Sequence, residues 1–220
     1  MREYLDIYCE RTAPGLWNEP VNTLTNLGFL IAAGLTLSLY LQVYRGRHEQ
    51  GWDRLLLIIL LAAIGVGSGL WHLTAQRWAM LADVLPIAGF ISVFLLVFLV
   101  RVAGLGLLPT LSMFLLYHAV NWWVQASLPP DLLNGSVFYL PTWTALVLMT
   151  LWLAYKGHAQ WHAYAWASGL FLVSLTLRTI DLAWCGLLPI GTHFIWHLLN
   201  ALLLYLLVRS VLKAATLRFR

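Results

Sequence analysis

Runs of about 20 apolar residues recur along this 220-residue chain, and they limit its fold more than any other feature. A bilayer core about 30 Å thick is crossed by about 20 such residues in a helix. The chain is 61% hydrophobic and only 10% charged, whereas soluble domains average about 45–50% and about 25%. No soluble domain fits between the runs. We therefore predict an all-α integral membrane protein.

The apolar runs predict a bundle of seven membrane-spanning helices. They cover residues 22–44, 54–74, 79–101, 104–124, 136–155, 161–178 and 190–212. The sixth run is short and contains Ser168 and Gly169, so six or eight spans remain alternatives.

Lys and Arg are unevenly distributed between the two ends of these spans. Of the 13, nine fall at one set of alternating ends: Arg45, Arg47, Arg54, Arg101, Lys156, Arg209, Lys213, Arg218 and Arg220. By the positive-inside rule that side is cytoplasmic, which places the N-terminus outside and the C-terminus inside. We expect an extracytoplasmic segment at 1–21, one transmembrane domain at 22–212 and a basic cytoplasmic tail at 213–220. The net charge of +4 then reflects membrane orientation, and it gives no support to nucleic-acid binding.

Five polar residues within the spans carry the functional signal, since polar groups at membrane depth are costly. Ser68 and His72 are four residues apart in the second span, and so are His193 and His197 in the seventh, so each pair shares a helix face. Asp83 lies near the start of the third span. The second span runs outward and the third and seventh start outside, so all five are expected at the outer face.

Three histidines with a fourth position left open to water are the usual donor set of catalytic zinc, whereas structural zinc sites close all four positions with protein ligands. Only two Cys are present, which excludes a closed thiolate site. Zinc lowers the pKa of bound water to about 7 and polarises carbonyl groups, which favours acyl-bond hydrolysis. A haem held by two histidines and a proton relay are the alternatives for these residues.

Asp83 is the candidate general base, and Ser68 the candidate donor to the water or the oxyanion. Each also has a structural interpretation, because an acid in a first turn stabilises a helix and a small residue eases helix packing. His118 lies near the outer end of the fourth span, and three roles remain open for it. It is a fourth metal ligand, a residue that supports a ligand, or a contact between helices.

Three sequence blocks resemble the alkaline ceramidases, which are seven-helix membrane hydrolases related to the adiponectin receptors. The blocks are YCER with EPVNTLTNLGFLI, GVGSGLWHLTAQRWAMLADVLP, and RTIDLAWC with GTHFIWHLLNALLLY. The resemblance implies zinc ligands at His72, His193 and His197, with Ser68 and Asp83 beside the metal. It also implies hydrolysis of the amide of ceramide-like lipids to a long-chain base and a fatty acid.

The resemblance has two further implications for the extracytoplasmic side. Eukaryotic members hold calcium in the N-terminal segment, and Glu10 and Glu19 match its two glutamates. Ile7 and Thr12 depart from its Asp and Asn, although Asp6 is a partial substitute, and calcium prefers several carboxylates. Cysteines at the positions of Cys9 and Cys185 imply a disulfide in an oxidising compartment. The alternative is two free, packed thiols.

The leading interpretation is a multi-pass, zinc-dependent lipid amidase of sphingolipid metabolism, with its active site toward the extracytoplasmic side. A membrane lipid is the expected substrate, and the sequence indicates no protein partner. Ester hydrolysis of phospholipids or lipid anchors is the alternative within the enzyme class. A non-enzymatic seven-helix receptor is the alternative outside it, although a receptor needs no base such as Asp83 beside three metal ligands.

Overall fold

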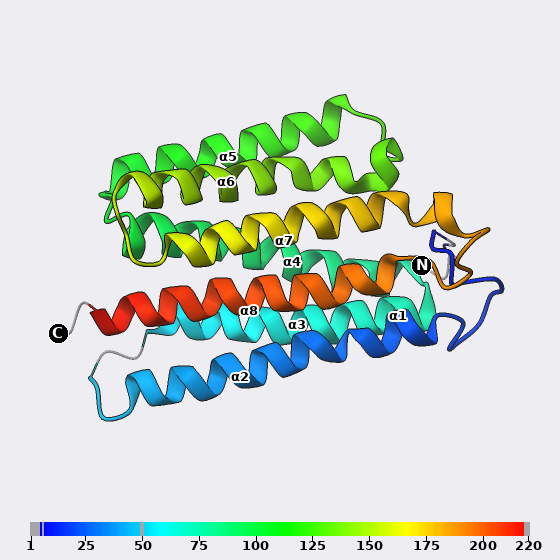
Figure 1. Ribbon diagram of the computed structural model, residues 1–220, viewed down its shortest axis with the longest axis horizontal. Coiled ribbons are helices and arrows are strands. Elements are labelled where there is room, and N and C mark those ends of the chain that lie inside the picture. Colours follow the sequence, from blue (N-terminus) through cyan, green and yellow to red (C-terminus); the bar gives the residue numbers. More distant parts are fainter. Residues whose placement is uncertain (1–4, 6, 49–50, 218–220) are drawn as a thin grey trace.

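The computed structural model describes residues 5, 7–48 and 51–217, and its fold is all-α. Figure 1 shows the long helices side by side, running back and forth along one axis. Their bounds are α1 Pro20–Thr25, α2 Leu27–Tyr44, α3 Trp52–Thr74, α4 Arg77–Val97, α5 Leu107–Ser127, α6 Leu140–Tyr155, α7 Trp161–Ile180 and α8 His193–Leu217. Three short helical segments lie between the long helices, at Phe98–Val102, Leu132–Tyr139 and Leu182–Trp184. Asp6, Arg2, Arg218 and Arg220 lie outside the described residues.

Six helical runs in the described part of the chain are long and apolar enough to cross a membrane. One of them joins α1 and α2, which meet end to end at Asn26. The run that is not among the six is α5, although its 21 residues would reach roughly 31 Å at 1.5 Å per residue. Polar residues on α5, including His118, Asn121 and Gln125, lower its apolar character. Residues 5, 7–48 and 51–217 therefore contain seven long helices, counting α1 and α2 as one, and six candidate spans.

Two helices begin later than the predicted spans, because a turn containing a glycine of positive φ precedes each of them. The last span was expected from residue 190, but α8 begins at His193. Residues before it form a turn in which Gly191 has a φ of +64° and lies against the Asp181 carboxylate, where a Cβ would collide. The fourth span was expected at 104–124, and α5 occupies Leu107–Ser127 because Gly104, with a φ of +68°, lies in the turn that precedes it.

Helices α3 and α4 pack closely at one point, and that contact positions two candidate site residues. A Cβ added to Gly67 would overlap the carbonyl of Ala82 and lie 3.0 Å from the backbone nitrogen of Asp83. The absent side chain lets the two backbones approach, as small residues do in membrane helix pairs. Ser68 on α3 is thereby brought beside Asp83 on α4.

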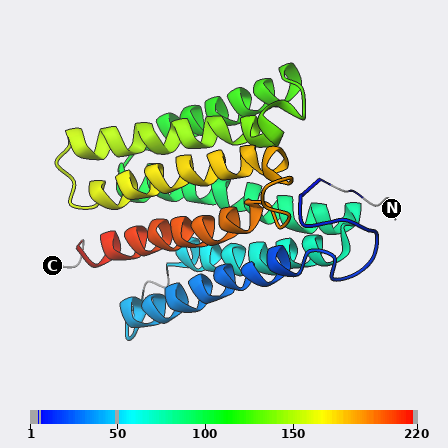
Figure 2. The same cartoon turned by 45° about the vertical axis from the view of Figure 1, so that its right-hand side comes forward.

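The N-terminal segment crosses one end of the bundle, as Figures 1 and 2 both show. Its Tyr8 packs in a small cluster with Trp71, Ala75 and Ala79 from the end of α3 and the start of α4. Cys9 forms a disulfide with Cys185, which follows α7. We call this end of the bundle the site end, because the candidate site lies there.

Candidate metal centre

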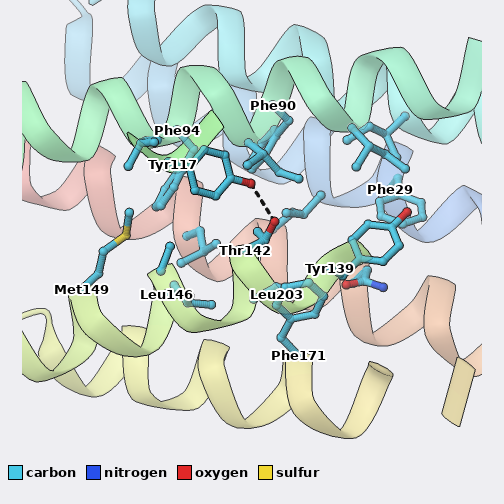
Figure 3. Close-up of a pocket in the computed structure, with 18 of the residues that line it drawn as sticks. Phe29, Phe90, Phe94, Tyr117, Tyr139, Thr142, Leu146, Met149, Phe171 and Leu203 are labelled. Carbon is cyan, nitrogen blue, oxygen red and sulfur yellow. Dashed lines mark hydrogen bonds between the residues drawn. The ribbon is translucent and has the colours of Figure 1, made fainter. Parts of the chain in front are cut away.

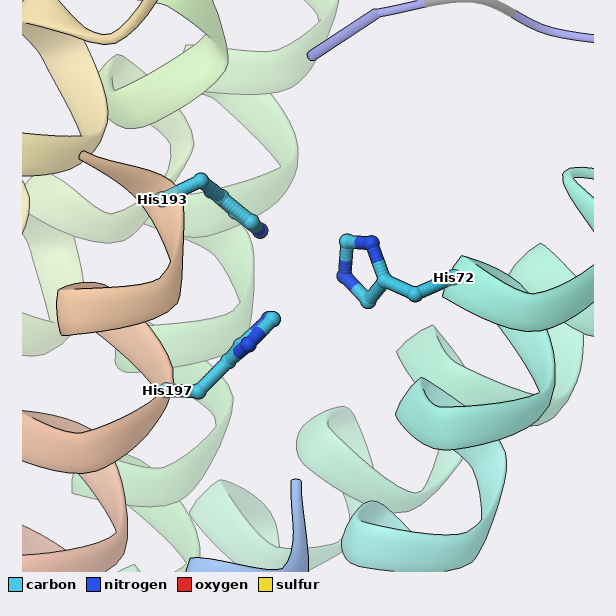
Figure 4. A group of neighbouring side chains, drawn as sticks. All are labelled: His72, His193 and His197. Atoms are coloured by element: carbon cyan, nitrogen blue, oxygen red, sulfur yellow. The ribbon is translucent and has the colours of Figure 1, made fainter. Parts of the chain in front are cut away.

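Three buried histidines converge at the site end. His72 comes from the last turn of α3, and His193 and His197 come from the first two turns of α8. Figure 4 shows His72 facing the two rings of α8. One ligand nitrogen from each of the three lies within 4.8 Å of the other two, and the residues are only 1%, 3% and 1% exposed.

The size of this cluster fits a single metal ion. Tetrahedral zinc at about 2.0–2.1 Å from nitrogen would place its ligand nitrogens roughly 3.4 Å apart, so the rings need only a small closing movement. The Nδ1 atom of His193 is buried and has no hydrogen-bond partner among the described residues. An unsatisfied buried nitrogen is costly, and a metal nearby gives a reason for the arrangement.

Glu19 sets the tautomer of the neutral His72 ring. Its Oε2 atom lies 2.5 Å from His72 Nδ1. A carboxylate only accepts hydrogen bonds, so Nδ1 is the donor, and in the neutral ring Nε2 then has the free lone pair. A carboxylate behind a histidine is the usual support for a metal ligand.

Thr25 sets the tautomer of the His197 ring in the same way. The Thr25 hydroxyl lies 2.8 Å from the Val21 carbonyl, to which it donates its one proton. Its oxygen is 3.0 Å from His197 Nδ1 and therefore accepts a hydrogen bond from that nitrogen. Nε2 of His197 is thus free to bind a metal.

Arg11 holds Glu19 in place. Its Nε atom is 2.5 Å from Glu19 Oε1, and its Nη2 atom donates to the His72 carbonyl at 2.6 Å. Both Arg11 and Glu19 are buried, at 3% and 2% exposed. Burial favours the neutral acid, but the hydrogen bonds and charges of His72 and Arg11 outweigh it, so the pKa of Glu19 lies below its usual value.

The two glutamates of the predicted calcium segment have other partners. Glu10 accepts the backbone N–H groups of Val21 and Asn22 at 2.7 and 2.8 Å, so it caps the start of α1. Glu19 points inward to Arg11 and His72. In the described part of the chain, the three histidines are the one group of three or more His, Cys, Asp and Glu residues arranged to hold an ion.

Asp181 positions the start of α8. Its Oδ1 atom accepts the backbone N–H groups of Thr192 and His193 at 2.6 and 2.9 Å, and its Oδ2 atom accepts that of Cys9 at 3.3 Å. A carboxylate at a helix N-terminus satisfies open amides and favours the helix dipole. One fully buried side chain thus fixes His193 and the disulfide segment together.

Tyr8 covers the cluster from the N-terminal segment. Its ring stacks on His193 with centroids 3.9 Å apart and lies 4.9 Å from His72. Burial raises the pKa of the Tyr8 phenol above its usual value, so it stays protonated and uncharged.

Asp83 and Ser68 lie beside the histidines. The Asp83 carboxylate is close enough to Ser68 and His72 to interact with both. Its Oδ1 atom is buried and has no hydrogen-bond partner within the described residues. The five residues predicted from sequence therefore lie at one end of one bundle. His118 is not part of this cluster, and its ring contacts those of Phe114 and Tyr117 on α5.

Sequence reasoning missed Tyr8, Arg11, Thr25 and Asp181. All but Tyr8 act through other residues, at sequence separations of up to 172. Contacts over such separations leave no spacing pattern in the sequence. The one usable signal was that Arg11 and Asp181 are charged residues in a chain that has few of them.

An apolar cavity adjoins the histidines. Its volume is about 100 Å³, and its walls include Phe29, Trp196 and Asn200. Figure 3 shows the rings and aliphatic chains that line it, with a Tyr117–Thr142 hydrogen bond at its side. Phe29 also contacts the His197 ring, with centroids 6.5 Å apart. A second apolar cavity of about 690 Å³ shares Tyr117 and Met149 with it.

One family model, described as Ceramidase, matches residues 8–217. The match spans nearly the whole chain, so the chain belongs to the ceramidase family. A comparison with curated proteins finds no match. The chain is thus a multi-pass, helical member of that family with a buried three-histidine cluster at one end.

Proposed function

We propose that this member of the ceramidase family is a zinc-dependent hydrolase that cleaves the amide of ceramide-like lipids into a long-chain base and a fatty acid. The observation that carries the proposal is the convergence of His72, His193 and His197, with two of the three rings held in the tautomer that leaves Nε2 unprotonated. Family membership supports the amide as the bond that is cleaved.

The three histidine side chains favour zinc over the haem that the sequence left as an alternative. Three neutral imidazoles without a thiolate are typical of catalytic zinc sites with an open position. A haem held by two histidines would use only two of these rings, whereas one nitrogen from each of the three lies within 4.8 Å of the other two, which favours a single ion. A bound zinc supplies Lewis-acid chemistry, making water nucleophilic at neutral pH and polarising a carbonyl group.

The remaining steps fall to the residues of the chain. Asp83 Oδ1, which is buried and lacks a hydrogen-bond partner among the described residues, accepts the proton of the attacking water and passes it to the leaving amine. The Ser68 hydroxyl donates to the developing oxyanion. Glu19 and Thr25 hold two of the ligand rings and touch no substrate.

The adjoining cavities support a lipid substrate. An alkyl chain in the narrow apolar cavity beside His197 would continue into the larger one past Tyr117 and Met149. The polar end of the same lipid would then lie at the histidines.

The orientation in the membrane is part of the proposal. The excess of Lys and Arg at the end opposite the histidines supports a cytoplasmic C-terminus and an extracytoplasmic site. In that arrangement α5 is the seventh span, residues 1–21 lie outside, 22–212 form the hydrolase domain and 213–220 are the cytoplasmic tail. The Cys9–Cys185 disulfide at the site end supports an oxidising compartment there.

Detergent-purified protein tests the enzyme against the alternatives. We expect about one zinc per chain by elemental analysis, and markedly less in His197→Ala. An N-acyl amide lipid should release fatty acid, and the ester with the same chains is the comparison. Asp83→Asn should keep its zinc and lose turnover by about 100-fold or more, within the usual range for a general base. Cleavage of the ester alone would favour an esterase of phospholipids or lipid anchors, and no cleavage of either lipid would favour a receptor.

A further inference from the structure

A third cavity lies between α4 and α5 and shares Ile87, Ile91 and Thr142 with the narrow apolar one. Its volume is about 360 Å³, and its lining includes polar side chains that the reaction does not use. Arg178, one of its lining residues, interacts electrostatically with Asp83, so the cavity lies near the catalytic carboxylate. Tyr139 lines both this cavity and the narrow apolar one.

One face of α5 supplies much of its polar wall. His118, Asn121 and Gln125 are spaced three and four residues apart, which places them on one side of the helix. Polar residues in a membrane-spanning helix, as α5 is in the proposed arrangement, are costly and usually have a function. They lie in the half of α5 nearer the site end, because α5 ends there at Ser127 (Figure 1).

These α5 side chains have few partners inside the protein. The Asn121 Oδ1 atom is buried and unpaired among the described residues. The nearest partner of His118 Nε2 is Ser92 Oγ at 3.4 Å, and that hydroxyl donates to the Ala88 carbonyl at 2.8 Å. Hydrogen-bonding capacity therefore remains for a ligand.

Arg178 gives the cavity a positive charge. Its Nη1 atom donates to the Asn134 carbonyl and the Ser136 hydroxyl, and its guanidinium lies 5.6 Å from the ring centroids of Tyr139 and Trp196. Among the described residues, no carboxylate is within ion-pair distance of it. Asp83 interacts with this charge electrostatically, but the cavity lining itself contains no Asp or Glu, so inside the cavity the guanidinium is available to an anion.

We propose that this cavity binds a phosphate-bearing headgroup on the amide lipid, which extends the substrate class to headgroup-bearing ceramide-like lipids. This inference rests on the proposed function, because it places the alkyl chain in the apolar cavity and the amide beside Asp83. Arg178 binds the phosphate, and the polar face of α5 hydrogen-bonds the rest of the headgroup.

Equilibrium binding in nanodiscs of uncharged lipid tests the proposal. The two probes share their chains and carry a sulfonamide in place of the scissile amide, and one bears a hydroxyl where the other bears a phosphate. Wild type should bind the phosphorylated probe about tenfold more tightly, since hydrogen bonds to charged groups are the stronger ones. Arg178→Gln should remove this preference.

Gln125→Glu tests the same site without touching the contacts of Arg178. It adds one negative charge to the cavity wall and should weaken binding of the phosphorylated probe alone, by about tenfold. Gln42→Glu, exposed on α2 near the opposite end of the bundle, is the matched control and should change neither probe.

Equal binding of both probes by wild type would overturn the proposal, as would an unchanged preference in Gln125→Glu. Hydrolysis of the unphosphorylated amide is measured separately. Hydrolysis without a binding preference would refute the headgroup site alone, and a binding preference without hydrolysis would refute the proposed reaction alone.

Discussion

Glu19→Gln removes the carboxylate behind His72 and should weaken zinc binding without removing a ligand. The Glu19 carboxylate accepts one hydrogen bond from His72 and one from Arg11, each at 2.5 Å. An amide can accept only one of them, and it turns N–H groups toward the other donor. Supporting carboxylates of this kind contribute about 10- to 100-fold in metal affinity, which is about 1.4–2.7 kcal/mol. Zinc dissociation constants from competition with a chelator measure the change.

Two further variants separate metal binding from folding. Glu10→Gln removes an equivalent charge from the same segment, but Glu10 accepts only backbone amides and contacts no histidine, so zinc affinity should change less than about twofold. Glu19→Gln also breaks the buried Arg11–Glu19 ion pair, which should lower the melting temperature. Adding Arg11→Met removes the charge that Glu19 balances and should restore none of the zinc affinity. Wild-type zinc affinity in Glu19→Gln would refute the assigned role.

Three more predictions concern how the site end is held together. Asp181→Ala should destabilise the protein by about 1–3 kcal/mol per buried amide left unpaired, seen as a lower melting temperature and weaker zinc binding. Replacing both Cys9 and Cys185 with Ser should cost about 2–5 kcal/mol of stability, and chemical reduction of wild type should lower the melting temperature equally. Gly67→Ala should cost about 1–3 kcal/mol, because its Cβ would enter the backbone of α4. Gly69→Ala is its control, since the nearest heavy atom to that Cβ is 3.9 Å away. Equal melting temperatures for the two glycine variants would contradict the close-packing argument.

The helices and the core of the site were visible in the sequence for simple reasons. Membrane thickness requires long apolar runs, and the hydrogen-bonding needs of the backbone in lipid require helices. The four-residue spacing of His193 and His197 places both rings on one face, and alternating helix directions bring His72 to the same end. These regularities are local, so one sequence suffices to find them.

The irregular parts could not be predicted in this way. The start of α8 depends on Asp181, 12 residues before His193, and on a glycine that tolerates its approach. The role of Glu19 depends on Arg11 and His72, which the fold brings together from a separation of 61 residues. The resemblance matched Glu19 to a glutamate of the calcium segment, and it gave no sign that this carboxylate accepts hydrogen bonds from His72 and Arg11.

The status of α5 shows where composition alone is ambiguous. Its length suits a span, but its polar face removes it from the runs that are apolar enough to be recognised. The same polar residues line the cavity beside Arg178.

The most direct test of the account is zinc titration of metal-free protein with an N-acyl amide lipid as substrate. Fatty-acid release should be absent after chelation, rise in proportion to added zinc and reach its limit at one equivalent per chain. Release that persists without zinc, or none at one equivalent, would contradict the central claim that His72, His193 and His197 hold a catalytic zinc.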